Sequence, residues 1–532
     1  MFSDHCVGKV IAERLAELFS AESKWNDRQW RIGTVESMNE CIAGASSNAS
    51  ETRLQYVIGT TRRIIEKDPF LEGRARGDVL KSIPKSNQLK PGSHSFFVLK
   101  HEIDDLTSKY FEMIDSGVSR INESDAASSA DVDFNLWASY IAGHLQSLGL
   151  SDEWIVNHLN YHLKHNPNIV NLRHTLALIG DLWRKGSGPY TFLIPLTARA
   201  RFDHQTPPPW LSKNDFEDAF AEYFPGESIP THVGGFIVTV DCYDKYMAVS
   251  VLMERLETIA MKIRAAGETR RALIDNMAFM YPGYVEIDLV SNQKSATVTV
   301  PALDVGGGIT LLHPLEGKLE AALDLLASVD GVSQRSACVT AWAMIETLFA
   351  DADDFGGLAM IADRAADLLT CMYTVDLFHG IGSGHRKTED DQLADNLNVA
   401  SESERLGIVV DAFVSGVSIP GNWELGVVDC RTAKGLIVDV RGLTTLRTEF
   451  SDALRRLYDV RNQIVHAGIN QPHGLRFIFN SALSLQSAIM NEAIRNASSS
   501  KGSTGLLAAK CTWLLNRVDD GSKISALSVF RQ

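Results

Sequence analysis

Three polar residues near the end of one predicted helix have the types and spacing for acid–base chemistry. They are Arg461, Asn462 and His466. Residues four apart share a helix face, so Tyr458, Asn462 and His466 form one ridge with Arg461 beside it. Histidine exchanges a proton near neutral pH, and arginine can hold a phosphate through two hydrogen bonds. This pairing suits RNA cleavage by the RNA's own 2′-hydroxyl, with no metal required.

The same segment predicts a buried stripe that contains a charge. Its apolar residues recur at steps of three and four and are Leu446, Phe450, Leu454, Leu457 and Ile464. Arg461 falls inside this stripe, where a charge is costly unless it is paired. Glu346 occupies the matching step of a second stripe, so we expect Glu346 and Arg461 to face each other. From spacing alone, a purely structural pair with His466 as a helix-end cap is the favoured interpretation.

Residues 457–468 read Leu-Tyr-Asp-Val-Arg-Asn-Gln-Ile-Val-His-Ala-Gly, which resembles the signature of HEPN domains, particularly their Apea-like branch. Residues 341–349 are similar to the segment of that branch that carries an acidic residue. The resemblance covers about residues 314–496. It implies a bundle of four or five helices, commonly dimeric, in which the motifs of two protomers form a metal-independent endoribonuclease cleft.

In this resemblance Arg461, Asn462 and His466 are the catalytic motif, with Glu346 and Tyr458 in support. The family also implies RNA as the partner, single-stranded or looped as in tRNA, and a homodimer formed through the HEPN domain. Many members act in anti-phage defence by abortive infection, where an N-terminal region senses a phage-derived trigger. We expect this function and no cofactor. The alternative is a HEPN module that dimerises or binds without cutting RNA.

Two further motifs favour simpler interpretations. His158 and His162 have the i, i+4 spacing of a zinc-binding pair, but their helix has an ordinary amphipathic pattern, so we expect no metal site. Residues 380–387 read Gly-Ile-Gly-Ser-Gly-His-Arg-Lys and could cradle a phosphate through backbone amides. No strand pattern precedes them, so we expect an exposed loop.

The elements that must position these residues are mainly helices. We expect helices at 316–328, 334–350, 358–373, 442–467, 477–496 and 506–517, and a small α+β element at 232–302. The fold class is therefore mainly α, with a C-terminal HEPN-type helical bundle and an N-terminal mixed α+β regulatory region. We expect four regions, with boundaries at 1–130 (fold open), 131–305 (sensing), 306–497 (HEPN bundle) and 498–532 (tail helix).

Composition sets the broad class. The 532 residues are 45% hydrophobic and 22% charged, which is typical of folded globular domains. A net charge of −15 opposes a broad surface for duplex nucleic acid. Residues 441–480 nevertheless hold six arginines and three acids, a plausible RNA footprint. Seven scattered cysteines without a CxxC pair indicate reduced thiols. No secretory signal and no membrane-spanning segment is evident. We therefore expect a cytoplasmic protein without membrane contact.

Overall fold

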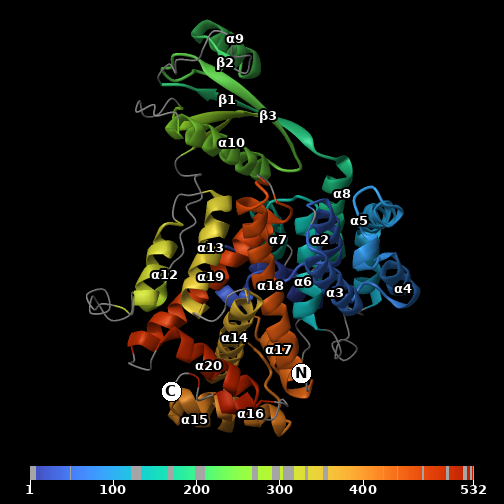
Figure 1. Cartoon of the computed structure of the whole chain (residues 1–532), viewed down its shortest axis with the longest axis vertical. Coiled ribbons are helices and arrows are strands. Elements are labelled where there is room, and N and C mark those ends of the chain that lie inside the picture. Colours follow the sequence, from blue (N-terminus) through green and yellow to red (C-terminus); the bar gives the residue numbers. More distant parts are fainter. Residues whose placement is uncertain are drawn as a thin grey trace. The chain divides into compact units, whose positions relative to one another are not determined.

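The computed structural model divides the chain into two compact units (Figure 1). The helical unit comprises Met1–Ser147, Ile155–Ala177 and Ala296–Gln532, and the sheet unit comprises Leu148–Trp154 and Leu178–Ser295. The structure describes residues 7–47, 49–120, 133–165, 172–197, 210–265, 274–289, 300–303, 315, 317–329, 333–351, 358–422, 425–439, 441–469, 472–498, 503–518, 524–527 and 530. The units follow boundaries different from those of the four expected regions, because residues 1–147 share a unit with the C-terminal helices.

The first half of the helical unit is a set of helices joined by short turns. They are α1 (Val7–Phe19), η1 (Trp25–Asp27), α2 (Thr34–Ser46), α3 (Glu51–Lys67), α4 (Gly73–Ser82), η2 (Ser86–Gln88), α5 (His94–Arg120) and α6 (Phe134–Ser147). The boundary between the units falls within α7 (Asp152–His165) and α8 (Leu172–Lys185).

The second half is also helical within the described residues. Its elements are η3 (Pro301–Leu303), α12 (Gly317–Ala327), α13 (Gln334–Phe349), α14 (Leu358–Thr388), α15 (Gln392–Val399), α16 (Glu402–Val414), α17 (Gly426–Val438), α18 (Gly442–Val465), α19 (Leu475–Ser498) and α20 (Thr504–Leu515). The helices expected from the sequence in this half are confirmed, and the chain is mostly helical as expected.

One hydrophobic core joins the two halves. Phe450 of α18 is fully buried, and Trp30, which follows η1, stacks on it with ring centroids 4.3 Å apart. Trp30 and Ile32 belong to the same buried cluster as the side chains of α13, α14, α18 and α19. Burial of large aromatic rings is among the strongest contributions to folding. The early helices are therefore part of the scaffold that holds α18.

Two glycines let the early helices approach closely. A Cβ on Gly143 of α6 would lie 2.4 Å from the backbone nitrogen of Gly33, which caps the start of α2. Real Cβ atoms do not come that close to backbone, so a side chain at Gly143 would force the two helices apart. Gly59, inside α3, has nothing within 4 Å of its Cβ position.

The sheet unit contains an antiparallel sheet with one helix on each face (Figure 1). The strands lie in the order β2-β3-β1-β4-β5. Their bounds, with those of the two helices, are β1 (Gly188–Pro195), β2 (Trp210–Leu211), α9 (Lys213–Tyr223), β3 (Gly235–Cys242), α10 (Lys245–Ala265), β4 (Met277–Tyr281) and β5 (Val285–Asp288). Successive residues of β1 alternate between the faces, with Phe192 towards α10 and Leu193 towards α9.

The expected α+β element is confirmed in β3, α10 and β5, but β1 and β4 were missed. Both are largely buried on both faces, so they lack the polar alternation that marks a strand. Residues 266–273 and 290–299 of the expected α+β element lie outside the described residues.

The expected loop at 380–387 is wrong, because α14 continues through it to Thr388. Phe378, Ile381 and His385 are all buried at steps of three and four, which extends the core stripe across the glycines. Gly382 lies against α16, where a Cβ would sit 3.1 Å from Val409. Gly382 thus serves close helix packing, and no phosphate-binding loop exists at this position.

Candidate active site

The motif lies at the C-terminal end of α18, where the helix leaves the core. The apolar residues Leu446, Phe450, Leu454 and Leu457 bury one face of the helix. The helix ends at Val465, and the backbone N–H of His466 donates to the carbonyl of Asn462 at 2.9 Å. Gly468 takes a left-handed backbone with φ of +64°, which favours glycine after a helix end. The chain turns away directly beyond His466.

Arg461, Asn462 and His466 contact one another. Nη1 of Arg461 donates to Oδ1 of Asn462 at 3.0 Å, and the same atom lies 2.9 Å from Nε2 of His466. A guanidinium has donors only, so Nε2 of His466 must be the acceptor and carry a lone pair. This geometry fits the neutral imidazole, which is the form that can remove a proton.

The three side chains are open to solvent to different degrees. Arg461 and Asn462 are half-buried, and His466 is exposed. An exposed imidazole at a helix end can meet a bulky polymer without any opening motion. The site therefore has the reactive groups and the access that RNA would need.

Tyr458 is tied to α13. Its ring packs on fully buried Trp342 with centroids 4.9 Å apart. Tyr458 thereby fixes the ridge that continues through Asn462 to His466. Its role in the structure is packing support for the motif.

The expected pairing of Glu346 with Arg461 is wrong. Glu346 is half-buried on α13. Among the described residues, its carboxylate forms no ion pair with the guanidinium of Arg461. The prediction failed because Arg461 is not on a buried stripe. Core burial fades in this last helical turn, where Val465 is 48% exposed, so Arg461 needs no buried acid.

Three of the six arginines in the predicted footprint are paired with acids. Nη2 of Arg447 lies 2.9 Å from Asp367, and Arg455 and Arg456 lie 2.9 Å and 3.1 Å from Asp363 and Glu40. These acids are outside residues 441–480, so the local charge count could not reveal them. Among the six arginines, Arg461 is the one that contacts the motif histidine.

A second polar face of α18, missed by the sequence analysis, is held by the N-terminal helices. Its residues are Glu449, Asp452, Arg456 and Asp459, spaced at three and four positions. We call this set the charged stripe. Glu449 lies 2.8 Å from Arg31 and 3.1 Å from Lys67, and Asp452 lies 3.0 Å from Arg63 and accepts from the Tyr56 hydroxyl. Arg456 meets Glu40 of α2, and Asp459 lies 2.8 Å from Arg53 of α3.

The environment of the charged stripe shifts several pKa values. Burial raises the pKa of Glu40 and of Asp459, and the nearby Arg456 and Arg53 only partly oppose this. Burial also acts on Glu449, but there Arg31 and Lys67 outweigh it and lower the pKa. The charged residues at helical spacing were visible in the sequence, although their partners were not.

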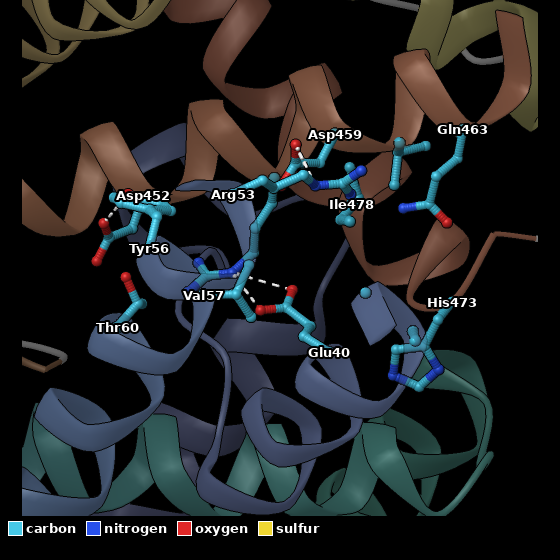
Figure 2. Close-up of a pocket in the computed structure, with 14 residues that line it drawn as sticks. Glu40, Arg53, Tyr56, Val57, Thr60, Asp452, Asp459, Gln463, His473 and Ile478 are labelled. Carbon is cyan, nitrogen blue, oxygen red and sulfur yellow. Dashed lines mark hydrogen bonds and ion pairs between the residues drawn. The ribbon is translucent and has the colours of Figure 1, made fainter. Parts of the chain in front are cut away.

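Figure 2 shows a recess between the charged stripe and the helices α2 and α3. Side chains of Glu40, Arg53 and Gln463 point into it from three elements. At the end of the recess, Nε2 of His473 lies 2.9 Å from Oε1 of Glu36. Burial disfavours the charged form of His473, but the carboxylate of Glu36 outweighs burial and raises the pKa of His473. Arg461, Asn462 and His466 do not line this recess, so the motif and the recess occupy different faces of α18.

The possible zinc pair forms no metal site in the part of the chain that the structure describes. The rings of His158 and His162 lie 4.7 Å apart, but no group of three or more potential ligands surrounds them or occurs elsewhere among the described residues. None of the described helices combines the length and the apolar character that a membrane span requires.

No family model, no curated protein and no solved structure matches this chain.

Proposed function

We propose that this chain is a metal-independent endoribonuclease of the HEPN type. The observation that carries the proposal is the contact between Nη1 of Arg461 and Nε2 of His466 at an exposed helix end, with Asn462 holding the same guanidinium. The signature-like run at 457–468 places these three residue types together, and the helix geometry brings their side chains into contact.

The proposed reaction uses the RNA as its own nucleophile. Nε2 of His466 takes the proton of a 2′-hydroxyl while that oxygen bonds to phosphorus and the bond from phosphorus to the 5′-oxygen breaks. Arg461 donates to the phosphorane oxygens and stabilises their charge. The departing 5′-oxygen takes a proton from the histidine of a second copy, which is why the proposal includes a homodimer. The products are a 2′,3′-cyclic phosphate and a 5′-hydroxyl.

The proposed biological role is anti-phage defence by abortive infection in the bacterial cytoplasm. Residues 1–147 belong to the scaffold of α18, so we assign trigger sensing to the sheet unit, which lies within the region 131–305. The six cysteines that the structure describes are all buried and form no disulfide bond, as reduced thiols in a cytoplasmic protein would.

The test compares purified wild type with His466→Ala on total bacterial RNA in EDTA, mapping fragment ends for 2′,3′-cyclic phosphate. We expect cleavage by the wild type and at least a hundredfold loss in the variant, because general acid–base catalysis contributes about 10²–10⁴-fold. His101→Ala, at an exposed histidine of α5, is the matched control and should cleave like the wild type. Equal cleavage by all three proteins would contradict the proposed role of His466.

The second candidate is a HEPN module that binds or dimerises without cutting RNA. It is favoured by the ion pairs that neutralise Arg447, Arg455 and Arg456, which reduce the positive surface near the motif. It predicts no cyclic phosphate ends under any condition, with or without phage infection of the producing cells. Cleavage that disappears in His466→Ala would exclude it.

A further inference from the structure

The hairpin between β4 and β5 carries exposed aromatic rings. Tyr281, the last residue of β4, is 44% exposed, and Tyr284, in the turn that links β4 to β5, is 37% exposed. Tyr223, the last residue of α9, lies beside them with its ring centroid 5.4 Å from that of Tyr281. We call Tyr223, Tyr281 and Tyr284 the tyrosine surface. Large exposed aromatic groups of this kind mark interaction sites, because water solvates them poorly.

Buried rings anchor the tyrosine surface. Phe224 lies 5.4 Å from Tyr284 and 6.4 Å from Tyr281, and Phe279 lies 5.8 Å from Tyr284. Phe224 and Phe279 are buried in the small core between α9 and the sheet. The exposed rings thus stand on a packed base, so little conformational entropy is lost when a partner binds them.

The rim of the tyrosine surface is acidic. The hydroxyl of Tyr284 donates to Oε1 of Glu286 at 2.7 Å, and Glu227 adds a negative charge close enough to act on Tyr284. Glu222, next to Tyr223 in the chain, is exposed like Glu227 and Glu286. Aromatic faces and carboxylates both attract cations, whereas phosphates would be repelled here.

We propose that the tyrosine surface is a docking site for a cationic peptide segment of a protein partner. An arginine or lysine of that segment stacks on Tyr281 or Tyr284 while Glu227 and Glu286 neutralise its charge. The acidic rim excludes RNA as the occupant. The inference is independent of the proposed ribonuclease activity, because peptide binding is measured without RNA cleavage.

The test uses the full chain and a fluorescein-labelled peptide of four Arg-Gly repeats, with binding followed by fluorescence anisotropy. We expect saturable binding in the wild type. Loss of two ring contacts in the double variant Tyr281→Ala, Tyr284→Ala should weaken it about tenfold, from the usual size of cation–π contacts. Tyr161→Ala, at a 58% exposed tyrosine of α7, is the matched control and should bind like the wild type.

A second pair of measurements separates the acids from the rings. Glu227→Gln with Glu286→Gln should weaken peptide binding and reduce its dependence on salt, while leaving the rings in place. Thermal melting of each variant checks that the sheet unit is still folded. Unchanged binding in the double tyrosine variant, or tighter binding of oligo-uridine than of the peptide, would overturn the proposal.

Discussion

Arg461 and His466 lie five positions apart at the end of α18, and Nη1 of the long Arg461 side chain reaches Nε2 of His466. Arg461 has no acceptor atoms, so its contact selects the form of His466 that offers a lone pair. A phosphate arriving at this site would compete with His466 for Arg461. Substrate binding itself would then free the imidazole for proton removal, if the proposed function is correct.

His144 gives a residue-scale prediction about pH. It is fully buried in α6 against the rings of Tyr110 and Phe111, its ring nitrogens have no hydrogen-bond partner, and burial lowers its pKa to about 3. In the unfolded chain the ordinary value near 6.5 applies. The unfolded state therefore binds more protons between these two values, so the free energy of unfolding falls as pH drops below 6.5.

The free energy of unfolding should fall by up to about 1.4 kcal/mol for each pH unit below 6.5, which is the energy equivalent of one pKa unit. Urea unfolding of the wild type and of His144→Leu between pH 8 and pH 5 measures it, and the difference between the two proteins removes the other titrating groups. The wild type should lose stability relative to the variant as pH falls. Parallel pH profiles would show that His144 is not buried in its neutral form.

At the scale of elements, two helical glycines predict opposite effects of the same substitution. Gly143→Ala places a methyl group against the backbone at Gly33, so it should destabilise the protein by at least about 2 kcal/mol, as overpacking of a tight contact does. Gly59→Ala fills open space in α3 and removes backbone freedom, so it should stabilise by up to about 1 kcal/mol.

Chemical denaturation of the two glycine variants provides the measurement, with the wild type as reference. Gly59→Ala serves as the control for the general effect of alanine in a helix of this unit. Equal shifts in the same direction for both variants would show that α6 and the start of α2 do not approach each other as closely as the structure has them.

The element scale also explains the arrangement of α18. One face of this helix is buried in the core, and another carries the charged stripe that meets α2 and α3. The ridge of Tyr458, Asn462 and His466 lies outside the recess and away from the centre of the core. The helix could be predicted from its apolar period, and so could the placement of its motif. The charged stripe was equally periodic, but a polar period does not distinguish a solvated face from one covered by other helices.

At the scale of the whole molecule, the C-terminal helices depend on the N-terminal ones. A fragment of residues 300–532 would lose the stacking of Trp30 on Phe450 and the partners of the charged stripe. Four charges of α18 would then lie beside exposed apolar surface without counter-ions. We expect this fragment to aggregate or to be digested rapidly by protease, although the expected HEPN region lies entirely within it.

Size-exclusion chromatography and limited proteolysis check this expectation. Co-expression of residues 1–177 should restore a compact complex, because these residues supply Trp30, Ile32 and the partners of the charged stripe. A fragment that runs as a compact, protease-resistant species without that partner would contradict the prediction, and would support an autonomous bundle with the boundaries expected from the sequence.

The sequence by itself determined the helical character of the chain and the meeting of Arg461, Asn462 and His466. Asn462 and His466 lie four positions apart, a spacing that the fixed rise and turn of a helix places on one face, and the long Arg461 side chain beside them reaches both. Only the tertiary structure decided the partners of Arg456 and Glu449 and left Glu346 apart from Arg461. Arg456 and Glu40 are 416 positions apart, and a contact across that distance leaves no local period, since it depends on how the whole chain packs.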